Sequence, residues 1–489
     1  MKLYSENDNY KLYEGNMLDM LDYIEPESIS SIITDPPYEL GFMNKGWDSS
    51  GIAFQKETWE KCFEVLKPGG YLLAFGGSRT YHRIACAIED AGFEIRDTIM
   101  WMYGSGMAKG LNIGLAIDKK NGVESEIIGY TNAPDFQDAG RKNVLNGGEN
   151  KVGFNVGDTA ERLATPIYKA QNEWDGWNTC LKPAYEPIIV ARKPFEGNCI
   201  DNILKYRIGG INIGECRVPI SQDDIDMINA KASKNPTDNY NNKEYQKYGN
   251  YKQNVATPAN INGRFPSNVI LTYNETDEKE VCSGFPYTKS TGGSGEASMN
   301  GTFRNIYNGG WGTKECSHLG GVGDEGSAAR YFYCAKTSAK DRDEGLDEFE
   351  VQAVRQLNAT NPEAEEKDDV SKRFITYKRN IHPTVKPTEL MQYLVRLVTP
   401  KGGVVLDPFN GSGSTGKACM WENKERKAEY KYIGIELTSE YLPIAQARIE
   451  YVINQKATTK EQAKLIDDAK KKAPQRENKL LNRIKQNKE

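Results

Sequence analysis

Short apolar stretches with the composition of β-strands alternate with amphipathic stretches of helical spacing at the start of this chain. Residues 29–34, 71–75 and 93–101 are strand candidates. Between them, residues 54–66 and 80–91 carry apolar side chains at helical intervals. This β-α-β-α order predicts a mostly parallel sheet with helices on both of its faces.

The same alternation returns near the C-terminus. An apolar helix stripe within 390–398 leads to a strand at 404–406, which a glycine-rich loop joins to a helix that begins at Ser414. A strand at 432–436 follows, and Ser439 is predicted to cap the next helix. We therefore predict an α/β fold in which both ends of the chain contribute to one Rossmann-like, doubly wound, mostly parallel sheet.

The middle of the chain lacks this periodicity and is rich in Asn, Gly, Lys and Tyr, which is typical of recognition inserts or of plain surface loops. Where Tyr, Trp and Arg occur, we favour recognition inserts. The predicted parts are a first half of the sheet at 1–195 with an irregular insert at 121–176, a recognition region and linker at 196–374, a second half at 375–452, and a basic tail at 453–489. The tail is either a helix that contacts phosphates or a solvated extension.

Composition narrows the class of protein. The 489 residues carry a formal net charge of -5, unlike a polybasic protein that coats DNA. The chain has no apolar run near the roughly 18–20 residues that span a bilayer, and its start lacks the layout of a signal peptide. Its nine cysteines include no Cys-x-x-Cys pair, which argues against a disulfide framework and a zinc ribbon. We expect a cytoplasmic protein with no metal site and no membrane partner.

The glycine loop at 411–416 satisfies the G-x-G-x-x-G pattern of nucleotide-binding turns. Glu436 follows at the end of the next predicted strand, where a carboxylate can accept hydrogen bonds from ribose hydroxyls. Lys417 brings the loop close to a P-loop pattern, but Ala418 cannot supply the hydroxyl that binds magnesium in such loops. The loop therefore favours a nucleotide cofactor other than ATP.

A second motif, Asp35-Pro36-Pro37-Tyr38, follows the predicted strand at 29–34, where open α/β sheets bind their ligands. Two successive prolines fix the backbone and remove two donors, which leaves carbonyl groups available as acceptors. The acid, a carbonyl and an aromatic ring together suit a planar substrate that bears an amine. The alternative is a proline turn that merely closes the strand.

These motifs together resemble the amino-methylating DNA methyltransferases that use S-adenosylmethionine. The resemblance depends on three segments, which are Asp35-Pro36-Pro37-Tyr38, His382-Pro383-Thr384-Val385-Lys386-Pro387 and Asp407-Pro408-Phe409-Asn410-Gly411-Ser412-Gly413-Ser414-Thr415. Their order is that of the family's β arrangement, and the similarity covers most of residues 10–452. Shorter stretches at 41–48, 181–187, 263–268 and 329–334 extend it, and the pattern is similar to the phage- and prophage-associated branch.

The resemblance implies a cofactor site in the C-terminal half. The residues implied to line S-adenosylmethionine are Asp407, Phe409, Gly411, Ser412 and Gly413. Glu436 would bind the ribose hydroxyls, and Thr384 and Lys386 would face the methionine end of the cofactor. Asn16 stands where relatives often have an aspartate that meets the adenine amine of the cofactor, and it can still accept one hydrogen bond.

The resemblance also implies catalysis by Asp35, Pro36, Pro37 and Tyr38. Asp35 and the Pro36 carbonyl would grip the 6-amino group of an adenine flipped out of double-stranded DNA, while Tyr38 stacks on the base. The nitrogen lone pair would then attack the sulfonium methyl group in line. Methylation of the cytosine 4-amino group is the main alternative, although aspartate at position 35 favours adenine over cytosine, whose enzymes more often begin this motif with serine.

Other classes remain open on the sequence alone: an oxidoreductase that uses the glycine loop, a DNA-binding module without activity, and methyl transfer to RNA or protein. Double-stranded DNA is the expected partner. Residues that are candidates for base-edge and phosphate contacts, with loop packing as an equal alternative, are Gly263, Arg264, Phe265, Arg304, Trp311 and Lys314. Trp47 either borders the flipped base or belongs to the core. A restriction endonuclease, where one exists, would be a separate chain, and a homodimer is compatible with the sequence. The expected setting is the cytoplasm of a bacterium, with a bacterial or phage gene.

Overall fold

The chain forms two compact units in the computed structural model. The first comprises Met1–Gly104, Tyr185–Gln356 and Phe374–Glu489, and the second comprises Ser105–Ala184 and Leu357–Arg373. The residues that the structure describes are 2–40, 46–103, 110–130, 166–220, 222, 224–226, 229, 261–274, 287–289, 325–327, 332–337, 339–355 and 375–455.

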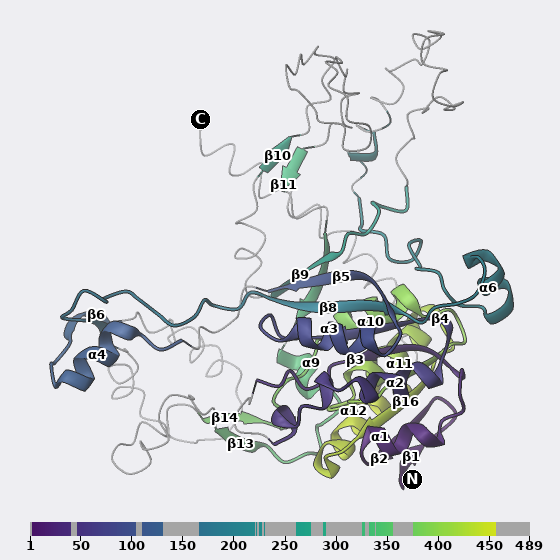
Figure 1. The fold of residues 1–489 in the computed structure, drawn as a ribbon. Coiled ribbons are helices and arrows are strands. Elements are labelled where there is room, and N and C mark those ends of the chain that lie inside the picture. Colours follow the sequence, from purple (N-terminus) through teal and green to yellow (C-terminus); the bar gives the residue numbers. More distant parts are fainter. Residues whose placement is uncertain are drawn as a thin grey trace, which may run out of the picture. The chain divides into compact units, whose positions relative to one another are not determined.

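A ten-stranded sheet forms the centre of the first unit (Figure 1). In order across the sheet, its strands are β1 (Lys2–Glu6), β2 (Tyr10–Glu14), β16 (Lys431–Glu436), β15 (Val404–Asp407), β3 (Ile29–Thr34), β4 (Leu66–Phe75), β8 (Tyr185–Arg192), β5 (Glu94–Met102), β9 (Val269–Asn274) and β12 (Tyr333–Thr337). Strand β8 runs antiparallel to both neighbours and β1 antiparallel to β2, whereas the other pairings are parallel. The predicted mostly parallel, doubly wound sheet built from both chain ends is confirmed.

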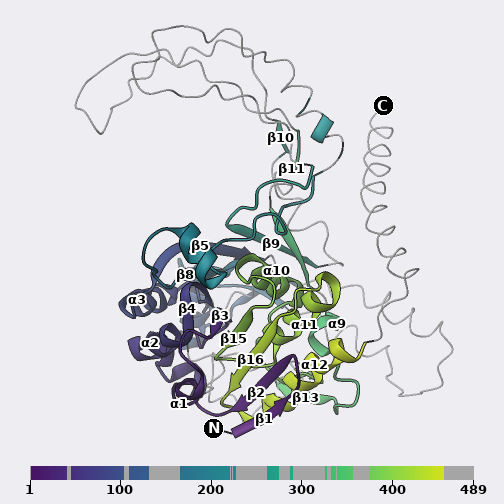
Figure 2. The same cartoon turned by 90° about the vertical axis from the view of Figure 1, so that its right-hand side faces the viewer.

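Helices cover both faces of this sheet, as Figure 2 shows. Those of the first unit are α1 (Met17–Met20), α2 (Lys56–Val65), α3 (Tyr81–Asp90), α6 (Cys199–Tyr206), α9 (Ala339–Asp343), α10 (Thr388–Val398), α11 (Ser414–Arg426) and α12 (Leu442–Asn454). Short 3-10 turns are η1 (Leu21–Tyr23), η3 (Gly46–Ser49), η4 (Ile52–Phe54) and η9 (Ser439–Tyr441).

Successive residues of the central strands face opposite cores. Ile32 and Leu72 pack with α1, α2 and α3, whereas Ile33 and Leu73 pack with α10, α11 and α12. Because side chains alternate across a strand, a strand covered on both faces has every residue buried. Residues 72–75 of β4 are accordingly apolar without a break, whereas Ser31 and Thr34, which are buried polar residues of β3, form hydrogen bonds with Thr399 and Asp407.

The predicted elements occur close to their expected positions, but the start of α12 differs. Ser439 does not cap this helix, because the 3-10 turn η9 precedes it and no side chain caps the turn. Instead, Pro443 occupies the first turn of α12, where its missing N–H needs no partner. The prediction of a Ser439 cap is therefore wrong.

The region at 196–374 contributes to the sheet as well as to loops. Strands β9 and β12 come from it and complete one edge of the main sheet. Two small antiparallel pairs also involve it: β10 (Tyr287–Lys289) with β11 (Glu325–Ser327), and β13 (Gln352–Arg355) with β14 (Ile375–Lys378). The prediction of a recognition region and linker did not include this structural role, because these strands are separated by long stretches without periodicity.

The second unit contains α4 (Ile113–Asn121) and the antiparallel pair β6 (Glu126–Tyr130) and β7 (Pro166–Lys169). The side chain of Asn112 caps α4 by accepting a hydrogen bond from the Leu115 amide, and Gly122 ends the helix in the left-handed conformation. The stretch at 121–176 is thus not irregular throughout. Within the described residues of the chain, no helix has both the length and the apolar character needed to cross a membrane.

The chain reverses direction across the sheet between β3 and β15. From β3 the next strand along the chain, β4, lies on one side, whereas from β15 the next strand, β16, lies on the other. Ligands of open α/β sheets bind beyond the carboxyl ends of the strands at such a switch point. The fold therefore points to the ends of β3 and β15 as the place for a binding site.

Candidate active site

Predicted site residues lie at the carboxyl ends of several neighbouring strands of the main sheet. Asp35 follows β3, and Asp407 and Glu436 are the last residues of β15 and β16. The amide of Gly15 donates to the Glu436 carbonyl (2.9 Å), which holds Asn16 beside the end of β16. The sheet thus brings together residues from the two ends of the chain.

The carboxylate of Asp35 has one occupied and one unoccupied oxygen. Its Oδ2 lies 2.6 Å from Nζ of Lys386. Its Oδ1 is buried and accepts no hydrogen bond from any residue that the structure describes. A buried acceptor without a donor is costly unless a ligand supplies one. Asp35 is therefore placed to accept a hydrogen bond from a substrate.

Lys386 joins Asp35 to a second carboxylate, Glu186 on β8. Its ammonium lies 3.4 Å from Oε2 of Glu186, and the same oxygen accepts a hydrogen bond from the Tyr38 hydroxyl at 2.7 Å. The ammonium also lies 5.3 Å from the centroid of the Tyr38 ring and 4.9 Å from that of Phe75. Lys386 was predicted to face the methionine end of the cofactor, but in the structure this buried ammonium contacts the two carboxylates, which compensate its desolvation.

Burial and charge act in opposite directions on this cluster. Burial raises the pKa of Asp35, Lys386 lowers it and Glu186 raises it, so that the pKa lies above the ordinary value for aspartate. Burial lowers the pKa of Lys386, but Asp35 and Glu186 outweigh burial and raise it. Burial and the neighbouring carboxylates raise the pKa of Tyr38. Lys386 and Tyr38 therefore keep their protons at neutral pH.

The two prolines fix the backbone between Asp35 and Tyr38. Pro36 and Pro37 are both buried. The carbonyl of Tyr38 accepts a hydrogen bond from Oγ1 of Thr80 at 2.8 Å, which anchors the end of the motif to the start of α3. Neither proline can donate, so their carbonyls lie in a segment without competing backbone donors.

Asp407 organises the start of the glycine loop. Its Oδ1 accepts hydrogen bonds from Oγ1 of Thr34 (2.7 Å) and from the amide of Phe409 (3.2 Å), and its Oδ2 accepts from Oγ1 of Thr415 (2.7 Å). Burial raises the pKa of Asp407 to about 7, although these hydrogen bonds lower it. The carboxylate therefore ties β3, the loop and the first turn of α11 together.

The glycines of the loop allow a tight turn that other residues would block. Gly411 and Gly413 have positive φ angles of 51° and 73°. A Cβ on Gly411 would lie 2.9 Å from Nε2 of His382, and a Cβ on Gly413 would lie 2.9 Å from Cβ of Ala445. The loop backbone can thus approach a ligand closely at the start of α11, where helix amides favour a polar group.

Glu436 and Asn16 lie at the end of β16, where Glu436 contacts the first glycine of the loop. Glu436 is only 8% exposed, and its two oxygens accept hydrogen bonds from the amides of Gly411 and Thr438, each at 2.7 Å. Each carboxylate oxygen can accept a second hydrogen bond, so Glu436 retains capacity for hydroxyl groups. The Asn16 side chain caps α1 by accepting from the Leu18 amide at 3.1 Å.

The segment before α10 lies against the glycine loop. His382 contacts the ring of Tyr441, and its Nδ1 donates to the Thr384 carbonyl at 2.7 Å. Burial lowers the pKa of His382 to about 3, so this imidazole is neutral. Its Nε2 is therefore an acceptor next to Gly411, and Thr384 is exposed nearby in the sequence.

The sequence did not single out some of the residues that complete the site. Glu186 belongs to a stretch at 181–187 that extended the resemblance without a role, and Arg448 on α12 gave no signal. Several predicted DNA contacts fall outside the described residues, namely Arg304, Trp311, Lys314 and the side chain of Trp47. Arg264 is described: its guanidinium pairs with Asp224 at 3.0 Å, while Phe265 is exposed.

The residues at the carboxyl ends of these strands suit a nucleoside cofactor. The described residues contain no group of three or more His, Cys, Asp or Glu side chains arranged to hold a metal. They do contain an acid with spare acceptor capacity, Glu436, and a close-approach glycine loop at a helix start. This donor and acceptor set fits the nucleoside part of S-adenosylmethionine.

Several known proteins are similar to this chain in sequence or in structure. A family model described as DNA methylase matches residues 29–447. Type II methyltransferase M2.LlaDCHI of Lactococcus lactis subsp. cremoris is 27% identical over 244 residues, which cover 44% of this chain and 86% of that protein. Type II methyltransferase M.HpaI of Haemophilus parainfluenzae is 35% identical over 106 residues, covering 20% of this chain and 33% of that protein. The solved PvuII DNA methyltransferase, which is cytosine-N4-specific, aligns over 91% of this chain and 90% of its own at 12% identity, with a TM-score of 0.37.

Proposed function

The chain belongs to the DNA methylase family, whose methyl donor is S-adenosylmethionine, and we propose that it methylates the exocyclic 6-amino group of an adenine flipped out of double-stranded DNA. The observation that carries this proposal is the buried, unpartnered Oδ1 of Asp35. An amine hydrogen is the donor that this oxygen lacks.

The proposed chemistry requires positioning rather than a covalent intermediate. The adenine amine is a poor nucleophile, because its lone pair is delocalised into the ring. Asp35 and the Pro36 carbonyl accept hydrogen bonds from its two N–H groups and draw the nitrogen toward tetrahedral geometry. Tyr38, whose hydroxyl is fixed on Glu186, stacks on the base. The freed lone pair then points at the methyl group, so that orientation and electrostatics lower the barrier.

Residues of the C-terminal half would hold the cofactor in this scheme. S-adenosylmethionine supplies an electrophilic methyl group when it is bound. Glu436 accepts hydrogen bonds from the ribose hydroxyls, and the loop through Phe409, Gly411, Ser412 and Gly413 lines the site. Asn16, Thr384 and Asp407 complete the proposed set, although Asp407 acts through the loop that it holds.

Adenine is proposed over cytosine because of aspartate at position 35, and the type of base is open to direct measurement. Modification-sensitive sequencing of DNA from a host that expresses the chain should reveal N6-methyladenine in one sequence context. N4-methylcytosine in its place would favour the cytosine alternative. Unmodified DNA, despite soluble protein that binds S-adenosylmethionine, would contradict the proposed function. A separate restriction endonuclease, a homodimer, a phage origin and a cytoplasmic location stay predictions.

Asp35→Asn tests the central residue. The substitution keeps the size of the side chain but can turn an NH2 group toward the substrate amine, so that donors face donors. We expect methyl transfer to fall at least about a hundredfold, which is the scale for losing one transition-state hydrogen bond. Affinity for S-adenosylmethionine, measured by calorimetry, should not change. Asp90→Asn, at an exposed position on α3, is the control with wild-type activity, and full activity in Asp35→Asn would refute the assignment.

A further inference from the structure

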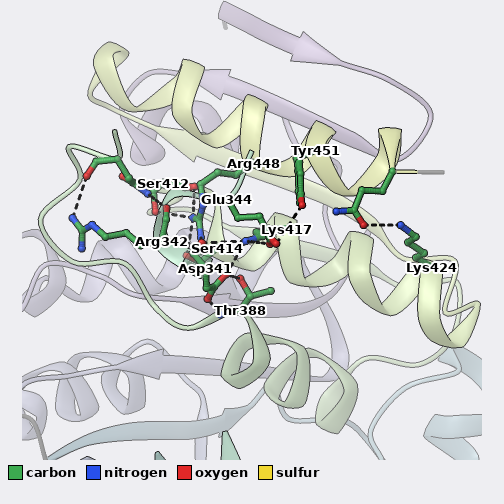
Figure 3. A network of polar contacts seen from close by, with 12 residues as sticks. Asp341, Arg342, Glu344, Thr388, Ser412, Ser414, Lys417, Lys424, Arg448 and Tyr451 are labelled. Atoms are coloured by element: carbon green, nitrogen blue, oxygen red, sulfur yellow. Dashed lines mark hydrogen bonds and ion pairs between the residues drawn. The ribbon is translucent and has the colours of Figure 1, made fainter. Parts of the chain in front are cut away.

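A short segment far from the cofactor motifs in sequence lies behind the glycine loop. Residues 339–346, which we call the brace segment, comprise α9 and the three residues that follow it. Figure 3 shows Asp341 and Glu344 beside Lys417 of α11, and Asp341 beside Thr388 at the start of α10. The sequence had placed this segment in the recognition region, and the active-site chemistry described above does not use it.

Asp341 of the brace segment binds two elements of the cofactor half. Its carboxylate accepts hydrogen bonds from the amide (2.8 Å) and Oγ1 (2.6 Å) of Thr388, the first residue of α10. Its Oδ1 also lies 2.7 Å from Nζ of Lys417 on α11. These contacts fix the start of α10, which directly follows the segment that contains Thr384 and Lys386.

Lys417 depends on the brace segment for its charge partners. This side chain is fully buried, at 0% exposure, and its ammonium pairs with Asp341 and with Glu344 at 2.8 Å. A buried ammonium without a carboxylate would be strongly unfavourable. The lysine that gives the glycine loop its P-loop appearance therefore points into the brace segment, which sets the position of the first turn of α11.

Arg448 extends the same network to the glycine loop itself. It is fully buried, and its guanidinium donates to the Ser412 carbonyl (2.8 Å), to Oγ of Ser412 (3.0 Å) and to Oγ of Ser414 (3.1 Å). A longer contact of 3.4 Å joins it to the Asp341 carbonyl. Burial lowers the pKa of Arg448 to about 10, while Asp341 and Glu344 raise it. Asp341 and Glu344 of the brace segment therefore place negative charge near this buried arginine.

The brace segment also holds the other cofactor stretch of the site. Arg342 donates to the backbone carbonyls of Asn380 (3.2 Å) and His382, and Asp343 accepts from the Asn380 amide at 3.0 Å. His382 in turn lies against Gly411. One eight-residue segment thus contacts the stretch at 380–386 directly and reaches the glycine loop through Lys417 and Arg448.

We propose that the brace segment positions the cofactor site, with Asp341 as its central positioning residue. Through Lys417, Thr388 and Arg448 it holds the glycine loop and the segment at 380–386 in register before any cofactor binds. The inference rests on the assignment of these two stretches to S-adenosylmethionine. It does not depend on which base is methylated.

Asp341→Asn tests the proposal in the full chain without DNA. Calorimetry with S-adenosylmethionine should show a dissociation constant about tenfold above that of the wild type, because the neutral amide no longer supplies the negative charge that faces Lys417 and Arg448. In turnover assays the KM for S-adenosylmethionine should rise by a similar factor. The KM for DNA, and kcat at saturating cofactor, should stay within about twofold, a split that general loss of structure would not give.

Two further variants make the test decisive. Thr388→Val removes only one hydrogen bond to Asp341 and keeps every charge, so we expect a weakening of about threefold with normal circular dichroism. Lys424→Met, on the same helix as Lys417 but bonded to Gln455 at 3.0 Å, is the control that should bind like the wild type. Combining Asp341→Asn with Lys417→Met should weaken binding no more than the larger single effect, because the two act as a unit.

Some results would overturn the proposal while leaving the function intact. Wild-type cofactor affinity in Thr388→Val would do so whether or not Asp341→Asn folds. Equal weakening of cofactor binding in Lys424→Met would also overturn the proposal. A rise in Asp341→Asn that is confined to the KM for DNA would overturn it too. Conversely, N4-methylcytosine in the sequencing experiment would overturn the adenine proposal and leave the proposal for the brace segment unchanged.

Discussion

At the residue scale, the notable feature is one ammonium shared by two carboxylates. Lys386 contacts both Asp35 and Glu186, so the cluster as a whole carries one uncompensated negative charge. The charged or titratable groups that face Asp35 are Lys386, Glu186, Tyr38 and Asp407. Glu186 raises the pKa of Asp35, and Lys386 lowers it. Glu186 thus influences both the ring of Tyr38 and the ionisation of the proposed acceptor.

Glu186→Gln should change the pH dependence of methyl transfer. Asp35 must be ionised to accept a hydrogen bond from the amine, so activity falls as the pH drops through the pKa of Asp35. Removing the Glu186 charge lowers that pKa, and the acidic limb of kcat should move to lower pH. Since glutamine still accepts from Tyr38, the weaker hydrogen bond should cost only about 1 kcal/mol, or roughly fivefold in rate at the optimum.

The control for this profile is Glu94→Gln, which removes a charge from β5 where Glu94 pairs with Arg192 rather than with the cluster. Its profile should match that of the wild type. An acidic limb that stays in place or moves to higher pH in Glu186→Gln would mean that Glu186 does not act on Asp35.

At the element scale, the conformation of the glycine loop depends on the close packing of α11 and α12 around it. Gly413 precedes α11, and a Cβ at this position would lie 2.9 Å from Cβ and 3.0 Å from Cα of Ala445 on α12. The loop conformation and the helix packing therefore require the same residue. Gly51 has a nearly identical φ of 74°, but a Cβ added there would meet nothing within 4 Å, which makes it a matched reference.

Gly413→Ala should destabilise the protein more than Gly51→Ala. Both variants carry the left-handed strain of roughly 1–2 kcal/mol, but only Gly413→Ala adds an overpacking cost of about 1–3 kcal/mol. The thermal unfolding midpoint in differential scanning fluorimetry should fall further for Gly413→Ala, by several degrees. Equal midpoints would show that α12 can shift away at little cost.

At the scale of the whole molecule, charge argues for DNA binding through specific contacts. The net charge of -5 opposes non-specific attraction to phosphates, and the positive charge that could offset it is local. The tail at 456–489 carries eleven Lys or Arg against five Asp or Glu, and it lies outside the described residues. A protein of this kind depends on base and shape readout for its affinity.

We expect weak binding to random duplex DNA at physiological salt, with a dissociation constant on the order of 1–100 µM. Removing residues 456–489 should weaken it further and reduce its dependence on salt concentration, because that segment carries a net charge of +6. Fluorescence anisotropy across a salt series measures both effects. Tight binding that resists salt, or a salt dependence unchanged by the truncation, would contradict this expectation.

Local patterns determined much of the fold and part of the site. The strands at 29–34 and 432–436 follow from their β-branched and apolar residues, and the turn at 411–416 follows from glycines, because a few neighbouring residues fix each of them. The Asp-Pro-Pro-Tyr motif was predictable for the same reason. Strands β9 and β12 were not predicted: β9 begins with the apolar run Val269-Ile270-Leu271, but both strands lie between stretches without periodicity, and their pairing in the sheet is what shows them to be strands.

The sequence by itself thus determined the type of sheet, the glycine loop and the acid at the end of β3. Only the tertiary structure decided that Lys386 pairs with Asp35 across 351 positions, that Glu186 fixes Tyr38, and that residues 339–346 support the glycine loop. The physical reason is that buried charges need partners at a few ångströms. Which partner lies there depends on the path of the whole chain, and no local pattern encodes that path.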